Sequence, residues 1–116
     1  MSMWQGQRIP EIKVTDVETG DVPSVMLDVR EPREWEAGHV AGSMWVPMGQ
    51  LESARFQLPM NRRIAVICRS GQRSARAVVQ LKEWGFEAVN VAGGIKAWVA
   101  EGKPIVRDDG SPGEVV

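Results

Sequence analysis

Short apolar runs alternate with helical patterns along this chain, and this alternation constrains its fold more than any other feature. Strand-like runs cover residues 24–29, 43–46, 64–67 and 88–91. Helical patterns cover residues 31–36, 50–56, 74–84 and 95–100. The run 24–29 is apolar nearly throughout, as a strand covered on both faces should be. Strands separated by helices form right-handed βαβ units, so we predict an α/β domain with a mostly parallel sheet flanked by helices.

Length and composition indicate a single globular domain. The chain has 116 residues, which is enough for one hydrophobic core but not for two. We assign residues 9–103 to the domain, residues 1–8 to an N-terminal tail and residues 104–116 to a C-terminal tail. The C-terminal tail includes the polar stretch 108–113, with the sequence DDGSPG, which is typical of poorly ordered chain ends.

Charge and cysteine content exclude several classes of protein. The net charge of −1 offers no basic surface for nucleic acid and no acidic excess that would favour disorder. A single cysteine forms no internal disulfide, which indicates a reducing compartment. The N-terminal residues contain no apolar run typical of a signal peptide, and no segment approaches the ~18 apolar residues of a membrane span. We therefore expect a cytoplasmic protein that binds neither nucleic acid nor membrane.

The only cysteine, Cys68, lies where the predicted strand 64–67 ends, shortly before the predicted helix 74–84. A loop in this position directs several backbone N–H groups inward, and the following helix adds the positive end of its dipole. Arg69 and Arg73 add full positive charges. These effects favour the thiolate and burial opposes it, so we expect the pKa of Cys68 to lie below its ordinary value. The same loop would also hold an anion.

An inert core cysteine is the plain alternative. A lone cysteine is most often a small buried side chain, and the apolar residues before Cys68 fit this interpretation. However, Arg69 and Arg73 would be costly beside an apolar site unless a negative group paired with them. Ligands of open α/β sheets also bind at the carboxyl ends of the strands, which is where Cys68 lies. We therefore favour a reactive cysteine.

Three motifs, in this order, resemble the single-domain rhodanese family. The first is LDVR at 27–30, followed by Glu34, GHVAGS at 38–43 and Pro47. The second, CRSGQRS at 68–74, resembles the rhodanese active-site loop, and the third, VAGGIKAW at 91–98, resembles the closing Gly-Gly motif and its helix. Three separate motifs make the resemblance specific. It implies a three-layer rhodanese-like domain with a central five-stranded, mostly parallel sheet, and activity as a thiosulfate sulfurtransferase.

The resemblance also implies a two-step transfer of sulfur through a persulfide of Cys68, the predicted catalytic residue. The donor would be a small anion such as thiosulfate, and the acceptor a thiol or cyanide, with no cofactor. The candidate substrate-binding residues are Arg69, Ser70, Gly71, Gln72, Arg73 and Ser74. Their N–H groups and guanidinium groups would hold the donor and stabilise the sulfite that leaves. Gly71 permits a turn with positive φ, and we predict that Ser74 caps the helix rather than donating to the sulfur.

Other functions remain open for this loop. Cysteine phosphatases place their arginine one residue further along, whereas four residues separate Cys68 from Arg73, and the shorter loop suits a sulfur atom better than a phosphoryl group. A second alternative is a persulfide carrier or docking module that exchanges sulfur with protein donors and acceptors. A third is a regulatory binding domain without a working cysteine, which the intact loop argues against. Turnover with thiosulfate would distinguish the enzyme from the carrier.

Other polar residues are predicted to support the fold. Asp28 and Arg30 lie at the carboxyl end of a predicted strand, where we expect an ion pair that braces the active loop, the alternative being a plain surface pair. His39, the only histidine, is expected to make a hydrogen bond within the scaffold, because a thiolate formed by the loop needs no base. One cysteine and one histidine also argue against a metal site.

Overall fold

The computed structural model describes residues 8–17 and 24–116, and its architecture is the predicted α/β fold. The strands are β1 (Glu11–Ile12), β2 (Val25–Asp28), β3 (Met44–Trp45), β4 (Ile64–Ile67) and β5 (Ala88–Val91). The helices are α1 (Pro32–Ala37), α2 (Leu51–Ala54), α3 (Gln72–Glu83) and α4 (Gly94–Ala100). Three single-turn 3-10 helices are η1 (Val14–Asp16), η2 (Met48–Gln50) and η3 (Arg55–Gln57). Residues 1–7 of the predicted N-terminal tail lie outside the described residues.

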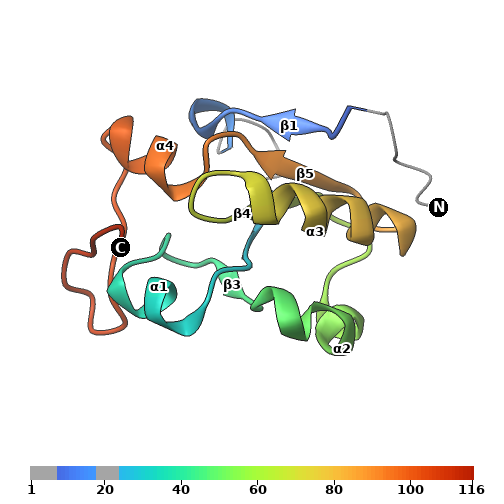
Figure 1. Ribbon diagram of the computed structural model, residues 1–116, viewed down its shortest axis with the longest axis horizontal. Coiled ribbons are helices and arrows are strands. Elements are labelled where there is room, and N and C mark those ends of the chain that lie inside the picture. The colour runs from blue at the N-terminus through green and yellow to red at the C-terminus, as the bar shows by residue number, and fades with distance from the viewer. Residues whose placement is uncertain (1–7, 18–23) are drawn as a thin grey trace.

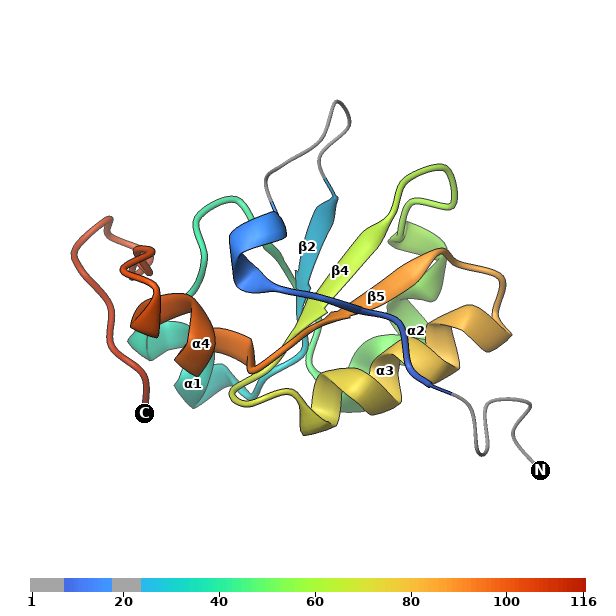
Figure 2. The same cartoon turned by 90° about the horizontal axis from the view of Figure 1, so that it is seen from above.

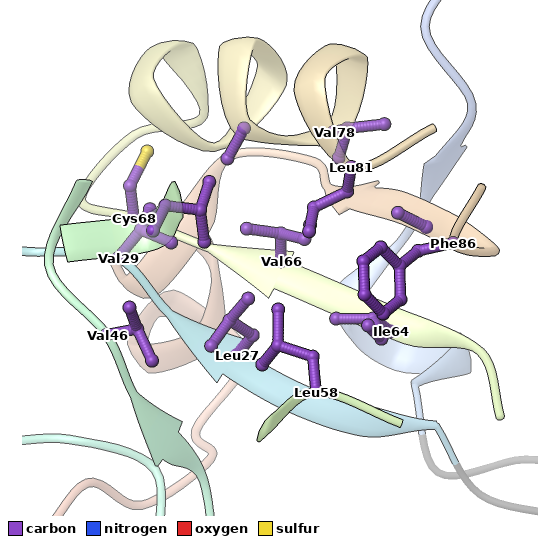
Figure 3. Packing of buried hydrophobic residues seen from close by; sticks show 13 residues of the cluster. Leu27, Val29, Val46, Leu58, Ile64, Val66, Cys68, Val78, Leu81 and Phe86 are labelled. Carbon is purple, nitrogen blue, oxygen red and sulfur yellow. The ribbon is translucent and has the colours of Figure 1, made fainter. Parts of the chain in front are cut away.

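The five strands form one parallel sheet in the order β1-β5-β4-β2-β3. The central strand β4 has four residues that are 0% exposed. Ile64 and Val66 belong to a core under α2 and α3, and Figure 3 shows Val78 and Leu81 of α3 in this core. Ala65 and Ile67 belong to the opposite core, which η1 and α4 cover. Figure 2 shows these two helical layers on the two sides of the sheet, which explains why the strand runs are apolar rather than alternating.

Because the strands are parallel, their carboxyl ends lie at one edge of the sheet. The loop after β4 begins with Cys68 and leads into α3, and the loop after β2 leads into α1. The loop after β5 contains Gly93 and leads into α4. Figure 1 shows α1 and α4 at the same end of the molecule. The topology therefore brings three motifs that are distant in the sequence to one place.

The first strand is the strand that the sequence pattern does not predict. Strand β1 pairs with β5 at the edge of the sheet, with Glu11 opposite Asn90 and Ile12 opposite Val91. The sequence analysis assigned no apolar run to residues 11–12, so only the family resemblance implied a fifth strand. None of the described helices is both long enough and apolar enough to span a lipid bilayer.

Residues 104–116, predicted as a C-terminal tail, return to the domain beside α1 (Figure 1). The backbone of Val106 forms an antiparallel bridge with that of His39. Gly38 and Gly113 have no side chains, which lets their backbones meet: a Cβ on Gly38 would lie 2.9 Å from the Cα atom of Gly113. This packing differs from the poorly ordered segment that the polar composition predicts, because composition carries no signal for such a backbone contact.

Candidate active site

The loop after β4 folds around the sulfur atom of Cys68. The backbone N–H groups of Gly71 and Ser74 donate to Sγ, with N···S distances of 3.1 and 3.3 Å. The Ser74 hydroxyl oxygen lies 3.2 Å from the same sulfur. Cys68 is only 1% exposed, and Figure 3 shows its sulfur directed towards the first turn of α3. Gly71 has a φ of +109°, so the predicted left-handed turn is confirmed. A sulfur surrounded by donors in this way is suited to carry negative charge.

Two opposing effects act on the pKa of Cys68. Burial raises this pKa, whereas the Ser74 hydroxyl and the backbone N–H groups of Ser74, Gly71 and Ser70 lower it, and the result lies below the ordinary value for cysteine. The direction is the one predicted from the sequence, and the loop N–H groups are among the predicted causes, whereas the Ser74 hydroxyl was expected to cap the helix instead. Among the described residues no guanidinium group donates to Sγ, so the loop amides and one hydroxyl make the hydrogen bonds that stabilise the thiolate.

The first turn of α4 holds the backbone of this loop from outside. The Ile95 N–H donates to the Cys68 carbonyl oxygen at 2.8 Å, and the Lys96 N–H donates to the Arg69 carbonyl oxygen at 3.1 Å. With its carbonyl oxygens bound to α4, the loop can turn its N–H groups towards the sulfur. Gly94 has a φ of +62°, and a Cβ on it would lie 2.6 Å from the Arg69 carbonyl oxygen. The Gly-Gly motif therefore provides the close packing that the loop requires.

The two arginines of the loop have different environments. The guanidinium group of Arg73 forms two parallel hydrogen bonds to the Glu34 carboxylate of α1, at 2.7 and 2.8 Å. Arg73 therefore ties the first turn of α3 to α1. Arg69 is partly exposed, and its Nε donates to the main-chain oxygen of Val116, the last residue of the sequence, at 3.0 Å. No Asp or Glu side chain of the described residues forms an ion pair with Arg69.

The remaining loop side chains lie away from the sulfur or in a role that differs from the prediction. The exposed Ser70 donates its hydroxyl proton to the Gln72 side-chain oxygen at 2.6 Å, so these two side chains bond to each other. The prediction that Ser74 caps α3 is wrong, because Gly71 occupies the N-cap position and Ser74 lies inside the first turn. There Ser74 contacts Cys68, and its hydroxyl donates to the Oδ1 atom of Asn90.

The expected ion pair between Asp28 and Arg30 is present, and both residues are 0% exposed. Nη2 of Arg30 donates to an Asp28 carboxylate oxygen at 2.8 Å and to the Gly38 carbonyl oxygen at 2.7 Å. The pair thus joins the end of β2 to the end of α1, the helix that carries Glu34. Among the described residues, the hydrogen bonds to the Cys68 sulfur come from the loop and α3, and the Asp28–Arg30 pair makes none of them.

His39 has the scaffold contacts expected for it. Its Nδ1 atom lies 2.9 Å from the Trp35 carbonyl oxygen, and its ring stacks on the Trp35 ring with a centroid separation of 3.6 Å. The side chain is buried, and Nε2 lies 3.6 Å from a carboxylate oxygen of the exposed Asp108. These contacts place His39 between α1 and the C-terminal segment.

Two polar residues at the site were not singled out from the sequence, Glu34 as the partner of Arg73 and Asn90 as the partner of Ser74. Glu34 was noted only as part of a motif and of an acidic first turn, and Asn90 only as one residue of a strand. A signal existed for Asn90, since it is a polar residue in a strand that is otherwise apolar and is buried in the structure.

Known proteins are similar to this chain in sequence and in fold. A family model described as the rhodanese-like domain matches residues 14–101. The chain belongs to the rhodanese-like domain family. A sulfurtransferase of Allochromatium vinosum is 35% identical over 94 residues, which cover 80% of this chain and 86% of that protein. The crystal structure of a rhodanese-related protein from Thermoplasma volcanium has a TM-score of 0.79 and 38% identity, and the match covers 84% of this chain and 97% of that one.

Some relatives of this rhodanese-like domain are longer proteins. YrkF of Bacillus subtilis, whose name describes a candidate sulfur carrier, is 39% identical over 77 residues, or 66% of this chain, and the match spans 42% of YrkF. The match to MoeZ of Mycobacterium tuberculosis, named as a candidate adenylyltransferase/sulfurtransferase, spans 21% of that protein. The names of these relatives have sulfur transfer in common, which is the chemistry supported at the level of the family.

The ion pair of Arg73 and Glu34 makes the stability of this rhodanese-like domain depend on pH. The hydrogen bonds from Arg73 lower the pKa of Glu34, burial opposes them, and the pKa lies below its ordinary value. The ionised carboxylate therefore stabilises the fold fully above its unfolded-state pKa and loses this effect as the pH falls through the folded-state value. We expect Glu34→Gln to reduce the free energy of unfolding at neutral pH by about 1–3 kcal/mol.

Urea unfolding at neutral pH and at about pH 3.5 would measure this effect. The difference in the free energy of unfolding between Glu34→Gln and wild type should become smaller below about pH 4. Glu36→Gln is the matched control, because Glu36 is an exposed carboxylate on the same helix. It should change the free energy of unfolding by less than about 0.5 kcal/mol. Equal effects of the two substitutions at neutral pH would contradict the role given to the Glu34 pair.

Proposed function

We propose that this rhodanese-like domain is a thiosulfate sulfurtransferase that carries sulfur as a persulfide on Cys68, from a small anionic donor to a thiol or cyanide acceptor. The observation that carries the proposal is the pair of backbone N–H groups, from Gly71 and Ser74, that donate to Sγ at 3.1 and 3.3 Å. A cysteine that only filled the core would not require amide donors directed at its sulfur. The family likeness supports sulfur transfer as the chemistry.

The proposed reaction has two displacement steps. The Cys68 thiolate attacks the sulfane sulfur of thiosulfate, the sulfur–sulfur bond of the donor breaks, and sulfite leaves with the bonding electron pair. The acceptor then attacks the terminal sulfur of the persulfide, and the Cys68 thiolate leaves in turn. Both steps place negative charge near the same loop, so donors held in place before the reaction can stabilise each of them.

The loop is suited to stabilise this negative charge because contacts between its carbonyl oxygens and α4 hold its N–H groups in place. Ile95 and Lys96 of α4 bind the carbonyl oxygens of Cys68 and Arg69, so the loop does not need to reorganise when charge develops. The terminal sulfur of the persulfide would lie in the same loop, close to the N-terminus of α3. The loop residues 69–74 are proposed as the substrate-binding set, with Asp28 and Arg30 supporting them through α1.

Arg69 is the loop arginine proposed to meet the anionic donor, because Glu34 already occupies Arg73. We expect Arg69→Ala to raise KM for thiosulfate about tenfold, the size of a lost charge-assisted contact, with little change in kcat. Steady-state production of thiocyanate from thiosulfate and cyanide would measure both constants. The matched control is Arg55→Ala, since Arg55 is also partly exposed but stacks over Trp84 beyond the C-terminal end of α3.

An unchanged KM in Arg69→Ala would mean that the loop N–H groups alone hold the donor. A fall in kcat with constant KM would instead indicate that Arg69 acts on the leaving sulfite only in the transition state. Either result would remove Arg69 from the proposed binding of the ground-state donor.

Mass spectrometry of the intact protein tests the proposed function directly. Incubation with thiosulfate should add one sulfur atom, and incubation of the loaded protein with a low-molecular-weight thiol or cyanide should remove it. Peptide mapping should place the added sulfur on Cys68. No gain of mass with any sulfane donor, from a protein shown to be folded, would rule out the proposed reaction.

A persulfide carrier is the second candidate, and the likeness to YrkF favours it. A carrier would be loaded rapidly by a protein donor and only slowly by thiosulfate. Loading rates measured with thiosulfate and with a cysteine desulfurase distinguish the two functions. Saturable turnover with thiosulfate alone supports the enzyme, and loading that requires the protein donor supports the carrier.

The cytoplasm is the proposed location, because the single thiol must stay reduced between turnovers. Fractionation of cells that express the tagged protein would test this. Recovery of the protein in a secreted or periplasmic fraction would contradict it.

A further inference from the structure

Asn90 of β5 is a buried polar residue that the proposed reaction does not use. It is 3% exposed and lies beside the Cys68 loop. Its Nδ2 group donates to the Gly71 carbonyl oxygen at 3.0 Å, which fixes the orientation of the carboxamide. Its Oδ1 atom then faces the Ser74 hydroxyl oxygen at 2.5 Å. An amide oxygen only accepts hydrogen bonds, so the Ser74 hydroxyl must donate its proton to Asn90.

The same hydroxyl group also contacts the reactive sulfur. Ser74 Oγ lies 3.2 Å from Cys68 Sγ, but a hydroxyl group has one proton and cannot donate to both neighbours. While that proton is directed to Asn90, Ser74 offers the sulfur only a lone pair, which suits the S–H group of a thiol. A thiolate has no proton to donate and only accepts hydrogen bonds, so it favours a hydroxyl that has rotated towards Sγ and adds a third donor to the N–H groups of Gly71 and Ser74.

This rotation has a cost at Asn90. Ser74 is the one hydrogen-bond donor to Oδ1 among the residues that the structure describes, and Oδ1 is buried. A buried acceptor that loses its donor destabilises the state in which this happens. Formation of the thiolate therefore gains a hydrogen bond at Cys68 and loses one at Asn90.

We propose that Asn90 is a positioning residue that competes with Cys68 for the Ser74 hydroxyl proton and so sets how readily the loop forms a thiolate. The proton of the thiol passes to water, and no covalent bond of Ser74 or Asn90 changes, since the hydroxyl only rotates. The part of this proposal that concerns the thiol and the thiolate does not depend on the proposed function. The part that concerns the persulfide rests on the proposed function. In the persulfide, Sγ is bonded to the second sulfur and carries no charge, so the hydroxyl returns to Asn90 while the persulfide is present.

Charged groups around the loop act on the same thiol and must be held constant in any test. Arg69 and Arg73 come from the loop and α3, Glu34 comes from α1, and the buried Asp28–Arg30 pair comes from β2. The Cys68 thiolate interacts electrostatically with Arg73. None of these groups is altered by substitutions at Ser74 or Asn90, so a double-mutant cycle on these two residues isolates the hydroxyl group.

The test is the pH dependence of iodoacetamide alkylation for wild type, Asn90→Leu, Ser74→Ala and the double variant. Leucine has nearly the shape of asparagine but neither accepts nor donates. Asn90→Leu frees the hydroxyl for the sulfur when Ser74 is present, but it cannot do so in the Ser74→Ala background. The change that Asn90→Leu causes in the alkylation midpoint of Cys68 should therefore lie about 0.5–1 pH unit lower when Ser74 is present than in Ser74→Ala. Loss of the contact to Gly71 affects both backgrounds equally and cancels in this difference.

Equal shifts in the two backgrounds would overturn the proposal, because Asn90 would then act only through the loop backbone. Asn90→Ala repeats the cycle if leucine prevents folding. In the wild-type protein, the ¹³C resonance of the Asn90 carboxamide should follow the Cys68 titration, and it should respond less in Ser74→Ala. A resonance that stays constant through the titration would also overturn the proposal. Neither measurement uses a sulfur donor, so both outcomes are independent of whether the protein transfers sulfur.

Discussion

The Cys68→Ser variant should acquire no sulfur from thiosulfate and produce no thiocyanate, while it folds as the wild type does. The serine oxygen can accept the same N–H groups of Gly71 and Ser74, so the loop keeps its hydrogen bonds. A serine hydroxyl group stays protonated at neutral pH, however, and is a far weaker nucleophile than a thiolate. The chain contains no second cysteine that could replace Cys68. Loss of the thiol should therefore remove the whole activity.

Two measurements on this variant separate chemistry from folding. Intact-protein mass spectrometry after incubation with thiosulfate reports the persulfide, and urea unfolding reports stability. The free energy of unfolding should stay within about 1 kcal/mol of the wild-type value, because the substitution is close to isosteric. Residual persulfide or thiocyanate from the purified variant would show that Cys68 is not the residue that carries sulfur.

The parts of the site that are local in sequence could be predicted. The position of Cys68 between a buried strand and a helix already predicts a loop of inward N–H groups, and the structure has two of them on the sulfur. The positive φ of Gly71 could be predicted for the same reason, since a tight turn favours glycine. The pairing of Asp28 with Arg30 spans only two residues, and a spacing of this size is visible in the sequence.

The contacts that join distant segments could not be predicted. Glu34 and Arg73 are separated by 39 positions, which is far more than a local motif spans. Only the parallel sheet brings α1 beside α3. The sequence pattern therefore assigned both loop arginines to the substrate, whereas the fold assigns one of them to a carboxylate. The role of Asn90 was missed for the same reason, because it depends on β5 lying next to the loop after β4.

Replacing Gly94 by alanine should be the most damaging single-methyl change at the site. Gly94 has a φ of +62°, which costs about 1–2 kcal/mol for a residue with a side chain. In addition, the new Cβ would lie 2.6 Å from the Arg69 carbonyl oxygen and closer still to that of Cys68, so the loop must move away from α4. We expect a loss of about 3–5 kcal/mol in the free energy of unfolding, together with a rise in the alkylation midpoint of Cys68.

Gly102→Ala separates the two causes of this damage. Gly102 has a φ of +79°, similar to that of Gly94, but nothing lies within 4 Å of a Cβ built on it. This control should therefore show the backbone cost alone and leave the alkylation of Cys68 unchanged. Urea unfolding and alkylation of both variants would test the comparison. If Gly94→Ala were no more destabilising than Gly102→Ala, and Cys68 reacted normally in both, the close contact of α4 with the loop would not be what holds the N–H groups in place.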